Sequence, residues 1–147
     1  MTKEQITKLL VITKNLIGKP YRYGARPEDA PAVFDCSSFT QYIFKQIGIE
    51  LPRSAILQAA DPQGQEIIPA ADFSNLEVGD LLFMRSDRGH YRDELFRGRA
   101  IEIGHVVIHV GGGVVINARS KKGGVLQEKL DALVQEPHYN INCIKRF

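Results

Sequence analysis

A cysteine at the start of a predicted helix, Cys36, is the residue in this sequence best suited to nucleophilic chemistry. Asp35 precedes it and can cap the helix with its carboxylate. The unpaired amides of a first helical turn stabilise a thiolate and can hold a developing oxyanion. The alternative is a small core residue, since free cysteine is often buried. Catalysis by Cys36 therefore requires a base and an orienting group elsewhere in the chain.

The best candidate for the base is His105, which opens the β-type run HVVIHV. Alternation along a strand puts His105, Val107 and His109 on one face, which could line a cleft. The three intervening aliphatic residues share the other face and are expected to point into a core. Two histidines on one face of a strand favour a functional interpretation more than one alone.

Asn117 is the candidate for the group that orients the imidazole. If the glycines at 111–113 form a hairpin that pairs Val110 with Val114, Asn117 falls opposite Val107. It is then a diagonal neighbour of His105 on the same face, roughly 7–8 Å away between backbones, which a side-chain amide can bridge. The alternative is a turn residue at the end of a strand.

A zinc site is the competing use of the same residue types. Cys36, His105 and His109 could ligate Zn²⁺, but a thiol at a helix start with an amide near the histidine fits nucleophilic catalysis better. We therefore expect no metal and no other cofactor. His90 and His138 are expected at the surface, and Cys143 is expected to be a core residue of a strand. No disulfide is expected.

The elements that must position these residues follow from periodicity and from turn signals. Helices are predicted at 3–17, 36–46 and 54–60, strands at 81–84, 105–110, 114–117, 125–127 and 139–144, and a helical turn at 128–135. Helices before strands favour an α+β fold with an antiparallel sheet over alternating βαβ units. Residues 85–103 fit no regular element and are expected to be either a functional loop or a solvated insertion.

Length and composition set the general class. The 147 residues, 44% hydrophobic and 24% charged, are expected to form one domain, 1–147, and a monomer. A net charge of +2 gives no reason to expect a nucleic-acid partner. No apolar run approaches the roughly 18 residues of a membrane span, and the amphipathic N-terminus does not look like a signal peptide.

Five blocks, in this order, resemble the signature of the NlpC family of cell-wall cysteine peptidases (the NlpC and p-sixty superfamily). They are GKPYRYG, FDCSSFTQYIF, GIELPRS with Gln58 following, VGDLLFM and GHVVIHVGGGVVINA, and they run from residue 18 to residue 118. The resemblance implies a papain-like α+β fold, with N-terminal helices packed on an antiparallel sheet and the nucleophile at a helix N-terminus. It implies that Cys36 is the nucleophile, His105 the base and Asn117 the third polar residue.

The resemblance also implies further site residues. Tyr21 aligns with a tyrosine that lines the site and helps to hold the oxyanion. Asp35 and Ser37 match the residues that flank the nucleophile, and Arg53 belongs to the PRS block. These four are expected at oxyanion or substrate-binding positions.

The implied activity is that of a cysteine endopeptidase on peptidoglycan or muropeptides. Its thiolate, paired with an imidazolium, would cut the link between D-glutamate and a diamino acid in the stem peptide through an acyl-enzyme. Such enzymes usually act outside the cytoplasm, although no export signal is expected in this chain. The alternatives are a papain-like amidase or acyltransferase on another substrate, and a catalytically silent cell-wall-binding domain.

Three departures from the family pattern are expected to affect substrate choice. Ser38 stands where the family usually has glycine and could narrow the groove or rotate the helix start. The connection at 27–33 and the arginine-rich stretch at 85–103 are longer than usual, and both are expected near the cleft.

Overall fold

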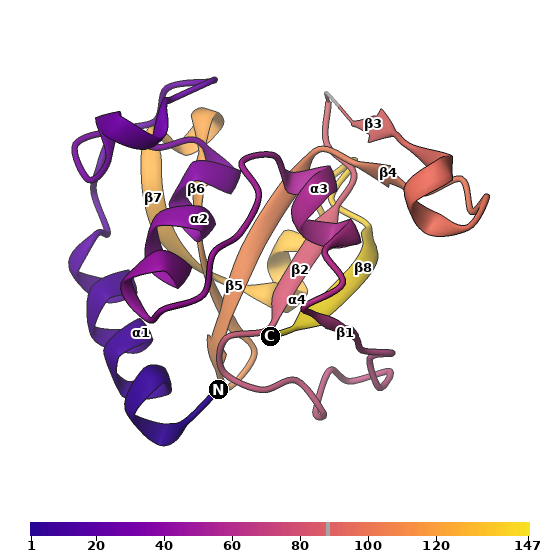
Figure 1. The fold of residues 1–147 in the computed structure, drawn as a ribbon, viewed down its shortest axis with the longest axis horizontal. Coiled ribbons are helices and arrows are strands. Elements are labelled where there is room, and N and C mark those ends of the chain that lie inside the picture. Colours follow the sequence, from indigo (N-terminus) through magenta and orange to yellow (C-terminus); the bar gives the residue numbers. More distant parts are fainter. Residues whose placement is uncertain (88) are drawn as a thin grey trace.

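A six-stranded antiparallel sheet, with most of the helices packed against one face, forms the body of the protein (Figure 1). The computed structural model describes residues 1–87 and 89–147. The strands of this sheet lie in the order β1-β8-β2-β5-β6-β7. Their bounds are β1 (Gln65–Glu66), β2 (Leu81–Met84), β5 (His105–Gly111), β6 (Val114–Arg119), β7 (Gly124–Lys129) and β8 (Ile141–Arg146).

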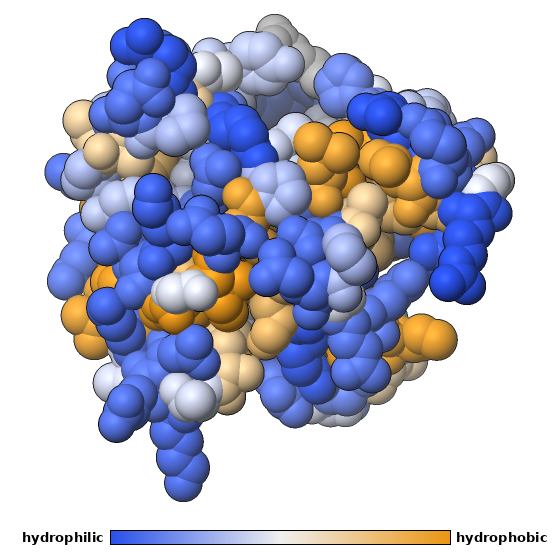
Figure 2. Space-filling model, in the orientation of Figure 1, coloured by the Kyte–Doolittle hydropathy of each residue, from blue (hydrophilic) through white to orange (hydrophobic). Residues whose placement is uncertain are grey.

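The helices are α1 (Lys3–Asn15), α2 (Cys36–Gln46), α3 (Ala55–Ala60) and α4 (Leu130–Leu133). The predicted bounds of α2 are confirmed, and those of α1 and α3 differ by two residues and one residue. No helix among the described residues has the length and apolarity that crossing a membrane would require. On the side seen in Figure 2 the surface is mostly hydrophilic, with apolar residues in separate patches.

The main core lies between α2 and the sheet. Helical spacing puts Phe39 and Ile43 on the same side of α2, where both are fully buried. They belong to one cluster with Val106 and Ile108 of β5. The aliphatic face predicted for β5 is therefore the face that carries the nucleophile helix.

The opposite face of β5 is mostly covered too. Val107 is fully buried in a second cluster with Leu82, Val115, Leu130 and Leu133, the last two from α4. The predicted cleft along this face is therefore limited to the beginning of the strand, at His105. The region under α4 is a core because its side chains are apolar.

The β5–β6 hairpin has the predicted register around the site but not at its turn. Ile108 pairs with Ile116, which by continuation sets Val107 opposite Asn117. Nearer the turn the register shifts, and Gly111 rather than Val110 pairs with Val114. The turn itself consists of Gly112 and Gly113, whose φ angles of +59° and +71° are the left-handed conformation that tight hairpins require.

Residues 85–103, of which Arg88 lies outside the described residues, are more ordered than expected. They contain a two-stranded sheet, β3 (His90–Tyr91) and β4 (Glu102–Ile103), and a short 3₁₀ turn. Phe96 from this turn is buried in the main core, and Arg99 pairs with Glu66 at 3.0 Å. The stretch is thus an excursion anchored at one end of the large sheet (Figure 1).

Candidate active site

Cys36 is the first residue of α2, and the turn that carries it is closed by a reciprocal cap. The Asp35 carboxylate accepts the backbone N–H of Ser38 at 2.8 Å, and the Ser38 hydroxyl accepts the backbone N–H of Asp35 at 2.9 Å. Ser38 is 2% exposed and, within the described chain, lines neither of the cavities beside Cys36. Of the two effects expected of Ser38, a narrower groove is not seen, because its side chain turns back onto the helix cap.

Arg53 fixes this helix start to the loop in front of it. Its guanidinium donates to the Asp35 carboxylate at 2.6 Å, to the Ser37 hydroxyl at 2.8 Å and to the Ala25 carbonyl. The same carboxylate accepts the N–H of Gly24 at 3.1 Å. The structure therefore brings Asp35, Ser37 and Arg53 together beside Cys36, largely in contact with one another.

Gln58, to which the sequence analysis assigned no role, ties α3 to the nucleophile helix. It is fully buried, donates to the Ser37 and Pro52 carbonyls at 3.0 and 2.8 Å, and accepts the Thr40 hydroxyl at 2.7 Å. A glutamine among the apolar residues of a short helix was the available signal, because a buried amide needs partners.

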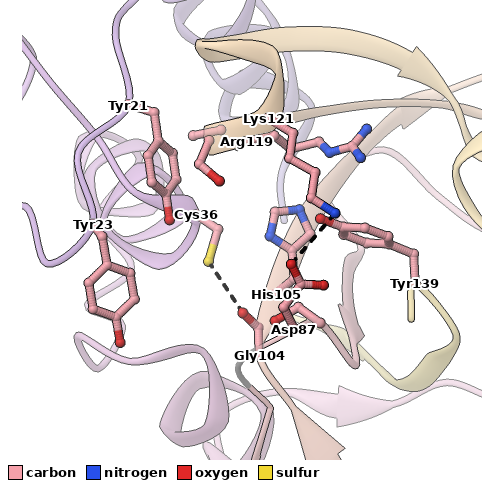
Figure 3. Close-up of a pocket in the computed structure, with 12 residues that line it drawn as sticks. Tyr21, Tyr23, Cys36, Asp87, Gly104, His105, Arg119, Lys121 and Tyr139 are labelled. Carbon is pink, nitrogen blue, oxygen red and sulfur yellow. Dashed lines mark hydrogen bonds and ion pairs between the residues drawn. The ribbon is translucent and has the colours of Figure 1, made fainter. Parts of the chain in front are cut away.

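His105 faces the sulfur from the beginning of β5. Its Nε2 lies 2.8 Å from Oδ1 of Asn117, so that Nδ1 is the ring nitrogen left for the thiol. The Tyr139 ring packs edge-to-face on the imidazole with centroids 5.4 Å apart. Figure 3 shows Cys36 between Tyr21 and His105, with one ring nitrogen directed toward it. The predicted pairing of His105 with Asn117 is present in the structure.

A charged network around the buried Arg119, which the sequence pattern did not reveal, lies behind Asn117. Nδ2 of Asn117 donates to the Glu128 carboxylate at 2.9 Å. Glu128 pairs with Arg119, whose side chain is 1% exposed and which also pairs with Glu136 at 2.9 Å. The guanidinium lies 4.7 Å above the Tyr139 ring. The only signal in the sequence was the two-residue alternation of polar side chains along 117–128. That signal could not be interpreted without knowing the register between β6 and β7.

Tyr21 is held in place by two close backbone approaches. Tyr21 pairs with Phe34 in a parallel bridge, one residue before the helix cap. Behind it, the Lys19 carbonyl accepts the N–H of Val125 at 2.9 Å, and a Cβ on Gly124 would lie 2.1 Å from that carbonyl oxygen. Only glycine fits there. The hydroxyl end of Tyr21 points toward Cys36 (Figure 3).

Two cavities of about 200 and 240 Å³ flank the sulfur and share Tyr21, Tyr23, Cys36 and Gly104. The first extends past His105. Its other lining residues are Ser86, Asp87, Ala118, Arg119, Ser120, Lys121 and Tyr139. The second extends past the helix start. Its other lining residues are Gly24, Asp35, Ser37, Arg53, Ser54, Ala55, Ile56, His90 and Ile103.

The two long segments differ in their relation to these cavities. The 85–103 excursion lines both, as expected, and Asp87 pairs with Lys121 at 3.5 Å across the first. The connection at 27–33, expected near the cleft, lines neither cavity among the described residues. Asp29 instead ties it to Arg22 and Arg26 on the exposed side of the loop.

Burial in this site favours the neutral form of the thiol and of the imidazole. Burial raises the pKa of Cys36 from its ordinary 9.0 to about 11, and the negative charge of Asp35 adds to the shift. Burial lowers the pKa of His105 from 6.5 to about 4, against the opposing effect of the Asn117 hydrogen bond. Cys36 Sγ contacts the Gly104 carbonyl oxygen at 4.0 Å. Both shifts oppose the thiolate–imidazolium pair that the family resemblance implies.

The other histidines and the second cysteine lie apart from this pair. His109 is buried near the turn end of β5, where its ring contacts the Glu77 carbonyl at 2.9 Å and the Gly113 N–H at 3.3 Å. Cys143 is a buried free thiol on β8. His138 is exposed, and His90 is exposed at the edge of the second cavity. No group of three metal-ligating side chains is arranged to hold an ion among the described residues.

Known proteins share both the sequence and the fold. The NlpC/P60 family model matches residues 18–142. The probable endopeptidase p60 of Listeria grayi is 35% identical over 106 residues, which cover 72% of this chain and 16% of that protein. The structure of NlpC2 from Trichomonas vaginalis superposes with a TM-score of 0.76 at 22% identity, over 100% of this chain and 48% of that one.

A third likeness is to RipB from Mycobacterium tuberculosis, a structure described as a peptidoglycan hydrolase. Its TM-score is 0.67 at 21% identity, over 98% of this chain and 65% of RipB. The likenesses confirm the predicted papain-like α+β class. The chain spans less than a fifth of the length of the Listeria relative. Since the family model covers most of the sequence, this chain belongs to the NlpC/P60 family.

Proposed function

We propose that residues 1–147 form one catalytic domain of a cysteine endopeptidase that cuts peptidoglycan stem peptides. The bond we expect it to cut is the link between D-glutamate and the following diamino acid. Membership of the NlpC/P60 family, and relatives named endopeptidase or peptidoglycan hydrolase, support this substrate class. The observation that carries the proposal is the 2.8 Å contact of His105 Nε2 with Asn117, which leaves Nδ1 for the thiol of Cys36.

The reaction begins with a neutral pair. As Cys36 Sγ attacks the amide carbonyl carbon, Nδ1 of His105 takes the thiol proton. The oxyanion accepts hydrogen bonds from the Cys36 backbone N–H and the Tyr21 hydroxyl. His105 then gives its proton to the leaving amine, and the C–N bond breaks to leave a thioester. Water, deprotonated by His105, attacks the thioester, and the departing sulfur regains a proton.

The direction of the substrate follows from the base. The leaving amine must reach His105 to be protonated, so the diamino acid occupies the cavity that His105 lines. The acyl part then lies in the other cavity, along the helix start. Arg53 in the second cavity and Lys121 in the first are ion-paired with Asp35 and Asp87, and each can also donate a hydrogen bond to a carboxylate of a stem peptide.

The proposal is tested by mass spectrometry of muropeptide digests with the wild-type chain and two cysteine variants. We expect the wild type to release fragments cut after D-glutamate and Cys36→Ala to release none while keeping its thermal unfolding midpoint near that of the wild type. Cys143→Ala is the matched control, since it removes the other buried thiol, which lies in the core of β8, and should retain cleavage.

The outcomes separate the proposal from its alternatives. Cleavage that persists in Cys36→Ala would rule out the assigned nucleophile. A wild type that leaves muropeptides intact but hydrolyses glutamine amides or acyl esters would indicate an amidase or acyltransferase. A protein that binds muropeptides and cleaves none of these substrates would be a silent binding domain.

A further inference from the structure

We propose that Glu128 is a positioning residue whose carboxylate sets the orientation of the Asn117 amide and, through it, the tautomer of His105. The proposal rests on the proposed function only where it concerns reaction rates. The hydrogen bonds that carry it belong to the folded protein and can be examined without a substrate.

The β6–β7 register places Glu128 behind Asn117. Asn117 pairs with Leu126, and Val115 pairs with Glu128, so Asn117 and Glu128 are diagonal neighbours. Alternation puts both on one face of the sheet. Nδ2 of Asn117 donates to Oε2 of Glu128 at 2.9 Å, while Oδ1 faces Nε2 of His105 at 2.8 Å. The amide thus lies between the carboxylate and the imidazole.

The oxygen end and the NH₂ end of the Asn117 amide form different kinds of hydrogen bond, so Glu128 and His105 can tell them apart. An ionised carboxylate only accepts hydrogen bonds, so Glu128 selects the NH₂ end of Asn117. Oδ1 must then face His105, and because Oδ1 only accepts, Nε2 of His105 must carry a proton. In the neutral ring, Nδ1 is therefore the unprotonated nitrogen. A flipped amide would present its NH₂ group to Nε2, which would then have to be the unprotonated nitrogen. The ring proton would lie on Nδ1, and Nδ1 could not accept the thiol proton of Cys36.

Arg119 holds the Glu128 carboxylate in the position that this selection needs. Its buried guanidinium pairs with Glu128 and is held from the other side by Glu136, at 3.0 and 2.9 Å. A buried guanidinium stays charged and favours ionised partners. It also lies over Tyr139, whose ring packs on His105. The network therefore positions the imidazole in two ways, through the hydrogen bond with Asn117 and through the packing of the Tyr139 ring.

The first test reads the tautomer directly. In the Cys36→Ala protein at pH 7, ¹⁵N NMR of the His105 ring should show one tautomer, protonated at Nε2. Adding Glu128→Gln should give a mixture of tautomers, because a glutamine can offer NH₂ to Asn117 and allow the flip. Glu136→Gln is the matched control: it removes a carboxylate from Arg119 without touching Asn117 and should keep the single tautomer. An unchanged tautomer in Glu128→Gln would overturn the proposal.

The second test is a double-mutant cycle on muropeptide cleavage. Glu128→Gln should lower kcat/KM about 10- to 100-fold, the factor that corresponds to one hydrogen bond to a charged group. In an Asn117→Ala background the same change should add less than about twofold, because Glu128 acts through Asn117. An equal loss in both backgrounds would show a structural or direct role and overturn the proposal.

Folding and function can be separated from these outcomes. If thermal unfolding shows that Glu128→Gln does not fold, Glu128→Asp replaces it, since the charge beside Arg119 is kept while the acceptor is withdrawn from Asn117 by one methylene. A mixed tautomer is again the expected result, and a single one contradicts the proposal. If the wild type cuts no muropeptide, the proposed function fails, and the NMR result still decides the role of Glu128.

Discussion

The helix side of the site and its sheet side hold their reactive atoms by different means. On the helix side, Cys36 is placed by a cap closed between Asp35 and Ser38, three residues apart, and the cap is joined to the rest of the fold by contacts from Gly24, Arg53 and Gln58. On the sheet side, His105 depends on Asn117, twelve residues away on the next strand, and that residue depends in turn on a third strand.

The difference determines how each side can fail. A helix cap forms wherever its few residues take up the first turn, so the cap itself depends little on the rest of the fold. A strand pair that slips by one residue turns every side chain to the opposite face, which would take Asn117 away from His105. Activity should therefore be more sensitive to changes on the sheet side than to changes in the helix cap.

The largest effect in this comparison is expected from His105→Ala. It removes the base while the helix side stays intact, and the rate of muropeptide cleavage should fall by roughly 10²–10⁴, the usual contribution of general acid–base catalysis. His138→Asn is the matched control, because His138 is exposed and has a positive φ that asparagine tolerates. A His105→Ala protein with more than a tenth of the wild-type rate would contradict the assignment.

The two sides should also lose stability at opposite ends of the pH scale. Because the folded state lowers the pKa of His105 from 6.5 to about 4, the neutral ring contributes stability that is present above pH 6.5 and lost as pH falls through 4. The contribution is about 3 kcal/mol. It should appear as a shallower loss of unfolding free energy between pH 6.5 and 4 in His105→Ala than in the wild type, measured by urea titration.

Cys36 should show the reverse dependence. Its folded-state pKa is raised from 9.0 to about 11, so the contribution of the neutral thiol is present below pH 9 and lost as pH rises through 11. Cys143 is shifted in the same direction by burial. Cys36→Ala and Cys143→Ala should therefore each reduce the alkaline loss of stability. Iodoacetamide should label Cys36 slowly at pH 7, and labelling as fast as that of a free thiol would contradict the neutral state.

The smallest effect is expected from Ser38→Gly, which restores the residue usual in the family. It removes the hydroxyl that closes the cap, so the free energy of unfolding should fall by about 1 kcal/mol. Because Ser38 is buried away from both cavities, the muropeptide bond that is cut should not change. Ser38→Ala separates the lost hydroxyl from the added backbone freedom of glycine. A changed cleavage product would restore the idea that Ser38 shapes the groove.

Much of the fold could be predicted because its signals are local. The bounds of α2 and β2 follow from a cap, a helical repeat and an apolar run, and the structure has them as predicted. The short strands β1, β3 and β4 were missed because two residues carry no readable alternation. The turn of the β5–β6 hairpin was misplaced by one residue, since three successive glycines do not indicate which of them is paired.

The sequence by itself determined that a thiol begins a helix, that a histidine begins a strand, and that an amide lies diagonally across the hairpin from it. Hydrogen-bond patterns of short range and the two-residue period of a strand are enough for this. Only the tertiary structure decided that Glu128 and Arg119 stand behind Asn117, and that burial raises the pKa of Cys36 and lowers that of His105. Both depend on which distant segments exclude water from the site, and burial sets the pKa of each group.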